Sequence, residues 1–161
     1  MNEYVYIGKI VNTHGIKGEL RILSDFPYKN KVFIIDNKLI IDNKEYTIKS
    51  YRVHKDYDMV TFENYNSIND VLFLKNKKVY FPKDKLILDE NEILDEELIT
   101  YKVLTTNNET GTIEEIFNAS PTNKILRIKL DREVLVPISS PMIKEINKKE
   151  KTITIELMEG M

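Results

Sequence analysis

The feature that most constrains the fold is a period-two alternation of apolar side chains along short runs separated by turn residues. In "YVYIGKIV", residues 4–11, apolar side chains occupy both sets of alternate positions. We therefore expect a strand there that is buried on both faces of a small barrel or sandwich. The longest apolar runs fall far short of the about 20 residues that cross a bilayer, so no membrane contact is expected. The pattern predicts an all-β fold.

The first half of the chain reads as strands with one interruption. Two runs, "VFII" at 32–35 and "LII" at 39–41, flank the turn residues "DNK", which predicts a hairpin between two strands. Ser67 followed by Asp70 is an N-terminal capping pattern, so a short helix is expected over 67–74. The next strand, "KKVYF", should end at Pro82, which cannot donate a ladder hydrogen bond.

An acidic stretch divides the chain. Residues 83–97, "KDKLILDENEILDEE", lack strand alternation and favour a partly helical boundary. After it come six strand-like runs, with Gly111 expected to supply a positive φ in the turn "NNETG". We predict two small β-barrels in series: residues 1–85, an acidic linker at 86–97, and residues 98–161. A single larger β fold is the alternative.

Composition excludes several classes of protein. The chain of 161 residues has no cysteine, which rules out disulfides, thiolate metal sites and a cysteine nucleophile, and favours a reducing, cytoplasmic setting. Residues 1–85 hold 15 Lys and Arg against 11 Asp and Glu, whereas residues 86–161 hold 9 against 15. This asymmetry fits a mildly basic half near nucleic acid and an acidic half that meets a basic protein, although ordinary solvated surfaces explain it equally well.

Residues for catalysis are scarce. His14 and His54 are the only histidines, and their spacing matches no metal signature. No serine-hydrolase elbow or nucleotide-binding loop is present. We therefore expect no catalytic residue, no metal and no cofactor, and we expect a protein that is not an enzyme. The third-ranked hypothesis is a hydrolase that uses His14 and Glu19.

Three of the five glycines lie in "IGKIVNTHGIKGELRI", residues 7–22. The local explanation is backbone geometry, because Gly15 and Gly18 permit a positive φ in the connection between two strands. The second explanation is that His14, Lys17 and Arg21 present donors to RNA phosphates around a rigid turn. The residues alone favour the first and leave the second open.

Several motifs, in order along the chain, resemble the RimM family of ribosome maturation factors. "IGKIVNTHGIKGELRI" resembles the family's N-terminal G-x-I strand and H-G-I-x-G-E segment, and "INDVLFLKNKKVYF" resembles its A-x-x-L-x-G-x-x-V-Y pattern. "GTIEEIFNASPTNKILRIK" and "VLVPISSPMIKEINKKEKTITIEL" are similar to its C-terminal half. Lys124 departs from the customary aspartate of that half. The resemblance covers essentially the whole chain, and the order of its pieces carries more weight than any one of them.

The resemblance implies an elongation-factor-like barrel followed by a PRC barrel, in a monomeric protein that binds the head of the pre-30S subunit, with its 16S rRNA. The implied contact is a ribosomal protein of the head, the nineteenth of the small-subunit series, and the implied activity is to assist 16S rRNA processing. A ribosome-facing loop would contain His14, Gly15, Lys17, Gly18, Glu19 and Arg21. Ile93 and Leu94 match the family's paired aromatics before the PRC barrel, so the resemblance implies that this linker position binds the ribosome. Both keep the apolar bulk but lack the stacking and phenol hydrogen bonds of the aromatics. The second-ranked hypothesis is a PRC-barrel adaptor of another complex.

Overall fold

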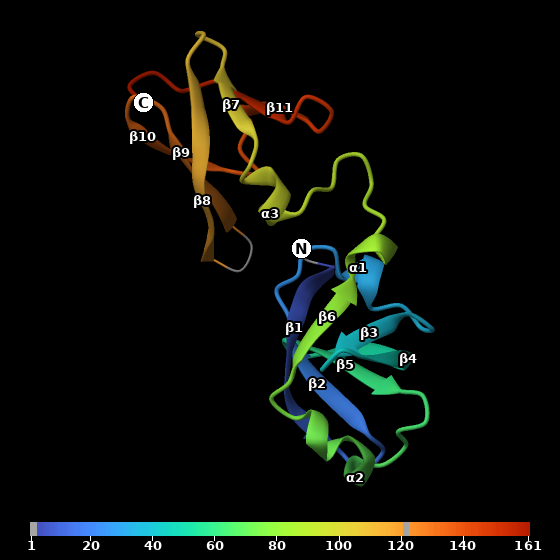
Figure 1. The fold of residues 1–161 in the computed structure, drawn as a ribbon. Helices are drawn as coiled ribbons and strands as arrows, with labels where there is room; N and C mark the ends of the chain where they lie inside the picture. Colours follow the sequence, from blue (N-terminus) through green and yellow to red (C-terminus); the bar gives the residue numbers. More distant parts are fainter. Residues whose placement is uncertain (1–2, 121–122) are drawn as a thin grey trace. The chain divides into compact units, whose positions relative to one another are not determined.

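The chain folds into two β units. The computed structural model describes residues 3–120 and 123–161, and these divide into compact units at Met1–Ile87 and Leu88–Met161 (Figure 1). Both units are built mainly from strands, which confirms the all-β prediction with an N-terminal and a C-terminal β domain. No helix in the described ranges is long and apolar enough to cross a membrane.

Six antiparallel strands close the N-terminal barrel. Their order around it is β1-β2-β5-β4-β3-β6. The bounds are β1 Tyr4–His14, β2 Glu19–Leu23, β3 Lys38–Ile41, β4 Lys44–His54, β5 Tyr57–Phe62 and β6 Lys78–Pro82. Closure pairs the first strand with the last and removes free sheet edges. The prediction that the strand ends at Pro82 is confirmed.

Burial along β1 differs from the prediction of two buried faces. Tyr4 and Tyr6 are exposed, whereas Ile7 and Ile10 are fully buried. Tyr4 and Tyr6 lie on the outer face by ordinary alternation with the buried Val5 and Ile7, so only one face of the strand is buried. A register shift between Tyr6 and Gly8 against β6 then resets the alternation, so Ile7 and Ile10, three positions apart, both face the core.

The expected strand over "VFII" is wrong. Val32 ends a one-turn helix, α1 (Lys29–Val32), and Phe33 follows it in the buried interior. Asn37 makes this turn stable, because its side-chain Nδ2 donates to the carbonyl oxygens of Lys31 at 3.3 Å and Val32 at 3.1 Å. These bonds satisfy carbonyls that a short helix leaves unpaired. Only the second run, as β3, joins the sheet.

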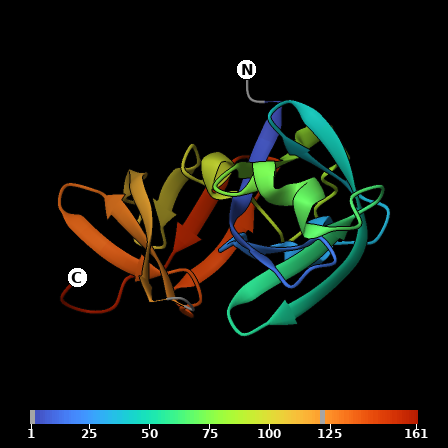
Figure 2. The same ribbon diagram turned by 90° about the horizontal axis from the view of Figure 1, so that it is seen from below.

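The predicted helix over 67–74 is confirmed as α2 (Ile68–Val71) continued by the 3₁₀ turn η1 (Leu72–Leu74). These turns cover one end of the barrel, where Val71 and Leu74 are buried, and α1 lies at the other end (Figures 1 and 2). A second 3₁₀ turn, η2 (Lys83–Lys85), follows β6.

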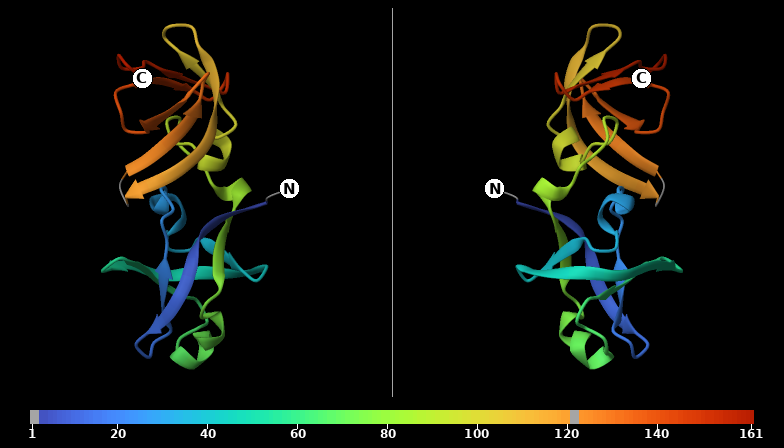
Figure 3. Two further views of the ribbon diagram at one scale, coloured as in Figure 1. Left: turned by 90° about the vertical axis from the view of Figure 1, so that its left-hand side faces the viewer. Right: turned by 90° about the vertical axis from the view of Figure 1, so that its right-hand side faces the viewer.

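The C-terminal unit is a six-stranded sheet in the order β10-β9-β8-β7-β12-β11. Its strands are β7 Lys102–Thr105, β8 Thr110–Ser120, β9 Asn123–Lys129, β10 Glu133–Pro137, β11 Ile143–Asn147 and β12 Thr152–Ile155. The six predicted runs therefore all form strands. Neighbours pair antiparallel except β12 and β7, which are parallel, and β8 and β9 form the longest ladder (Figure 3).

The start of this unit lies inside the acidic stretch. A short helix, α3 (Asp95–Leu98), begins there, as the partly helical expectation anticipated. Ile93 and Leu98 both belong to the C-terminal core. Lys124, the departure from the family pattern, pairs with Asp95 at 2.7 Å and so ties α3 to β9.

The expected positive φ at Gly111 is wrong. Asn108 takes the left-handed conformation in this turn, with φ 70°, while Gly111 lies within β8. A side chain at Gly111 would collide with the carbonyl oxygen of Lys129 on β9. Close strand approach, rather than turn geometry, explains this glycine.

Candidate functional site

The turn between β1 and β2 carries the predicted loop. His14 ends β1 directly opposite Glu19, which begins β2, and Gly15 and Gly18 adopt φ values of 70° and 86°. The prediction of positive φ at both glycines is confirmed. Gly18 also lies against other parts of the barrel, since a Cβ there would stand 2.6 Å from the carbonyl oxygen of Tyr65. The tip is therefore packed rather than loose.

The outer side of this turn faces solvent. The backbone N–H of Ile68 in α2 donates to the carbonyl oxygen of Ile16 at 2.9 Å, which fastens the tip to the helix. The Ile16 side chain is nonetheless 76% exposed, and Lys17 beside it is exposed. The turn thus presents one apolar and one cationic side chain on a fixed backbone.

Arg21 and His14 form a hydrogen-bonded pair on adjacent strands. The guanidinium Nη2 of Arg21 lies 2.8 Å from Nδ1 of His14. Because arginine stays protonated and only donates, Nδ1 accepts and the ring proton of His14 sits on Nε2. The guanidinium carbon also lies 5.6 Å from the ring centre of Tyr57, in a cation–π contact. These contacts fix Arg21 in one orientation.

Glu19 is occupied by an ion pair that links β2 to β4. Nε and Nη2 of Arg52 donate to its two carboxylate oxygens at 2.9 and 2.7 Å. These hydrogen bonds are the main reason that the pKa of Glu19 falls below its ordinary value of 4.5. A carboxylate held in a fork by arginine is a poor proton acceptor, which disfavours the hydrolase hypothesis that uses His14 and Glu19.

The structure brings His54 to this site, which the sequence spacing did not indicate. The rings of His14 and His54 have centres 5.5 Å apart. Loss of hydration, reinforced by the charge of Arg52, lowers the pKa of His54 below its ordinary value of 6.5. The two histidines are 40 positions apart in the sequence, so only the pairing β2-β5-β4 places them together.

We define the basic cluster as the basic side chains around His14 and Glu19, which are Arg21, Arg52, His54, Lys55 and His14 itself, together with Lys17 on the β1–β2 turn. Arg52, His54 and Lys55 are the members of this cluster that the predicted loop lacks. Their signal in the sequence is a grouping of Tyr and Arg residues at 51–57, which does not indicate that this segment lies beside the β1–β2 turn. Fixed guanidinium and imidazole donors of this kind suit phosphate oxygens.

The two predicted linker positions are not presented to solvent. Ile93 is 6% exposed and packs in the C-terminal core, and Leu94 is 9% exposed.

The excess of acidic residues in this half of the chain lies in the sequence around Ile93 and Leu94. Residues 88–97 contain six Asp and Glu and no Lys or Arg, whereas residues 98–161 contain nine of each. The negative charge of this half is thus concentrated in the segment of residues 88–97, which we call the acidic segment.

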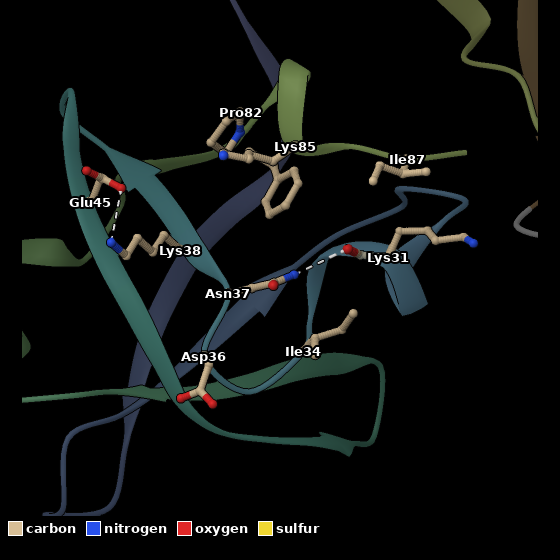
Figure 4. Close-up of a pocket in the computed structure, with 10 residues that line it drawn as sticks. Lys31, Ile34, Asp36, Asn37, Lys38, Glu45, Pro82, Lys85 and Ile87 are labelled. Atoms are coloured by element: carbon tan, nitrogen blue, oxygen red, sulfur yellow. Dashed lines mark hydrogen bonds and ion pairs between the residues drawn. The ribbon is translucent and has the colours of Figure 1, made fainter. Parts of the chain in front are cut away.

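A groove of about 690 Å³ marks another face of the N-terminal unit (Figure 4). Lys38 and Glu45 pair at 3.8 Å beside it, and Asn37 is engaged with the backbone of Lys31. The lining is charged and apolar, and it contains neither histidine nor serine. In the part of the chain that the structure describes, no three His, Asp or Glu side chains are grouped so as to hold a metal ion.

Two family models match the chain in succession. The RimM N-terminal domain matches residues 5–86, and the RimM PRC barrel domain matches residues 95–161. The chain is 37% identical over 165 residues to the ribosome maturation factor RimM of Staphylococcus aureus strain MRSA252, with 98% of each protein covered. It is 38% identical over 171 residues to that of Geobacillus kaustophilus, covering 100% of this chain and 97% of the relative.

Solved structures with the same description are more distant. A putative 16S ribosomal RNA processing protein RimM from Pseudomonas aeruginosa aligns with a TM-score of 0.45 and 18% identity, covering 98% of this chain and 99% of that one. The N-terminal domain of RimM from Thermus thermophilus aligns with a TM-score of 0.47 and 16% identity, covering 54% and 98%. With two domain models matched in order and full-length relatives above 30% identity, the chain belongs to the RimM family of ribosome maturation factors.

Proposed function

We propose that the chain acts in maturation of the small ribosomal subunit by binding the head of its precursor, and that it thereby assists 16S rRNA processing. The observation that carries this proposal is the match of both RimM domains, in order, over residues 5–86 and 95–161. The full-length relatives carry the name of ribosome maturation factor. The mode of action is binding without covalent chemistry, which favours one conformer of the rRNA over others.

The basic cluster supports a contact between the N-terminal barrel and 16S rRNA. Lys17 is exposed at the tip of the turn, and Arg21 and Arg52 are held in place by His14 and Glu19. A preorganised donor loses little conformational entropy when it binds a phosphate. The predicted loop therefore has three kinds of residue. Lys17 and Arg21 are the donors, His14 and Glu19 hold the arginines in position, and Gly15 and Gly18 form the turn.

The acidic segment supports a contact with a basic ribosomal protein of the head, the nineteenth of the small-subunit series. The segment holds six carboxylates and no Lys or Arg, which gives it a net negative charge although Asp95 is paired with Lys124. Ile93 and Leu94 serve here as buried anchors that hold this charge beside the PRC barrel, since both side chains are covered. Such a contact should weaken as salt rises.

Gradient sedimentation tests the proposal. A tagged protein should migrate with free small subunits, and its depletion should lead to accumulation of precursor 16S rRNA. Lys17→Gln should weaken this association, whereas Lys78→Gln, an exposed lysine of β6 away from the turn, should not. Absence from free small subunits together with normal rRNA processing on depletion would overturn the proposal and favour the adaptor hypothesis.

A series of binding measurements at increasing salt, made with purified components, tests the proposed electrostatic contact between the acidic segment and the head protein. Binding to the isolated head protein should weaken steeply between low and high salt, and Glu90→Gln combined with Glu97→Gln should flatten this dependence. Equal affinity at all salt concentrations would instead indicate a mainly apolar contact.

A further inference from the structure

Two large apolar side chains stand exposed at the barrel end covered by α2 and η1. Phe73 is 55% exposed and Leu72 is 50% exposed, although both lie within the short 3₁₀ turn that closes this end. Their neighbours Val71 and Leu74 face inward and are buried. Adjacent exposed apolar side chains on a fixed element are typical of a binding surface.

The Phe73 ring is the outer end of a chain of aromatic rings. Its centre lies 6.5 Å from that of Tyr65, which lies 5.4 Å from that of Tyr46. Tyr46 in turn lies 5.2 Å from Phe62 in the closed interior of the barrel, where both are buried. Tyr65 is half-buried, so it connects the exposed Phe73 ring to the core. Phe73, supported by Tyr65, therefore presents a preorganised aromatic surface.

Lysines without acidic partners surround this surface. Nζ of Lys44 lies 3.4 Å from the hydroxyl of Tyr65, and Nζ of Lys49 donates to Oδ1 of Asn66 at 3.3 Å. Lys75 follows η1, and Lys17 lies on the β1–β2 turn, which is fastened to α2. Throughout residues 3–120 and 123–161, the structure shows no ion pair from any of these four lysines to a carboxylate.

Nearby acids offset this charge only in part. Asp70 accepts a hydrogen bond from the backbone N–H of Asn66 at 3.1 Å, and Glu63 is exposed. An exposed ring that packs on a half-buried one and is bordered by lysines without ion-pair partners matches the requirements of single-stranded nucleic acid, whose bases stack on aromatic faces while lysines neutralise the phosphates. An apolar protein partner would make no use of this charge.

We propose that Phe73 and Tyr65 form a stacking platform for an unpaired base of RNA, with Lys44 and Lys49 beside the adjoining phosphates. This inference rests on the proposed function and adds to it a second RNA contact. The platform and the basic cluster are joined by the β1–β2 turn, which contacts α2 through Ile16 and β4 through Glu19. One strand of RNA can thus follow the rim of the barrel from one surface to the other.

Binding of a fluorescein-labelled single-stranded RNA of about ten nucleotides to the full-length protein tests the platform. By fluorescence anisotropy, Phe73→Ala should weaken binding about 5- to 150-fold, the loss expected for one stacked base. Phe73→Tyr should restore affinity, since it keeps the ring. Leu72→Ala is the matched control, because it removes an equally exposed side chain of the same turn, and it should change affinity less than about twofold. Circular dichroism verifies that each variant is folded.

The chain contains no tryptophan, so Phe73→Trp introduces a single indole reporter. Its fluorescence should be quenched as the same RNA is added, while that of Leu72→Trp should change little. Unchanged RNA affinity in Phe73→Ala would overturn the platform, as would an equal loss in Leu72→Ala, because leucine has no ring on which a base can stack. If the parent protein still sediments with small subunits in that case, the platform alone fails and the proposed function stands.

Discussion

Replacement of Ile93 by alanine separates a packing role from a contact role for the segment before the PRC barrel. Ile93 is 6% exposed and packs among the side chains of the C-terminal core, including Leu98 and Tyr101. The substitution removes three buried carbons at about 0.8 kcal/mol each and leaves a cavity, for a total cost of about 2–5 kcal/mol. Ile93→Val should cost about 0.5–1.5 kcal/mol.

Hydrogen exchange measured by mass spectrometry localises this loss. Peptides from β7, β9 and β12 report on the C-terminal unit, and peptides from β1 and β6 serve as an internal reference. A loss of about 3 kcal/mol should speed the slowest exchange of the C-terminal unit about 100-fold, since each 1.4 kcal/mol is a factor of ten. Ile87→Ala removes a side chain that is 79% exposed and should shift stability by less than about 0.5 kcal/mol.

The result that would refute this reasoning is unchanged exchange in the C-terminal unit together with lost sedimentation on small subunits. Ile93 would then act as a contact surface for the ribosome and not as a buried anchor.

Three further predictions concern the N-terminal barrel. Tyr51→Phe removes the hydroxyl that donates to the buried carboxylate of Asp58 at 2.5 Å, and should lower the free energy of unfolding in urea by about 1.5–3 kcal/mol; a change below about 0.5 kcal/mol would contradict the proposed importance of this bond. Gly18→Ala should lower the melting temperature of the protein more than Gly15→Ala does. Both positions need a positive φ, but only at Gly18 would the added Cβ lie 2.6 Å from a carbonyl oxygen. Equal melting temperatures of the two variants would argue against this close approach. The fold lowers the pKa of His54, so the unfolded chain takes up the proton before the folded protein does as pH falls. The free energy of unfolding should therefore decrease as pH falls from about 7 through 6.5. His54→Gln should flatten this part of the plot of urea midpoint against pH.

Much of the fold follows from local sequence chemistry. Alternating runs gave the strands of both units, Ser67 and Asp70 marked the helix over α2 and η1, and Pro82 marked the end of β6. Turn chemistry likewise predicted the positive φ at Gly15 and Gly18. These features depend on a residue and its near neighbours, and such signals are readable without knowledge of the rest of the chain.

The candidate site was only half predictable. The residues of the β1–β2 turn could be named from their order along the chain, but Arg52 and His54 could not be assigned to them. Their proximity depends on β4 reaching the turn by way of β5, a pairing between segments more than 30 positions apart. No local sequence pattern indicates that Arg52 and His54 lie beside the β1–β2 turn.

The sequence by itself determined an all-β chain with two successive units, a Gly-punctuated turn and an order of motifs typical of the RimM family. Tertiary structure alone decided that a bulge at Tyr6–Gly8 leaves both Ile7 and Ile10 facing inward, that "VFII" becomes a helical turn, and that Ile93 is buried. The physical reason is that register and burial are set by packing between distant segments. An apolar side chain can be buried equally well from a strand or from a turn, so its presence in the sequence does not decide between them.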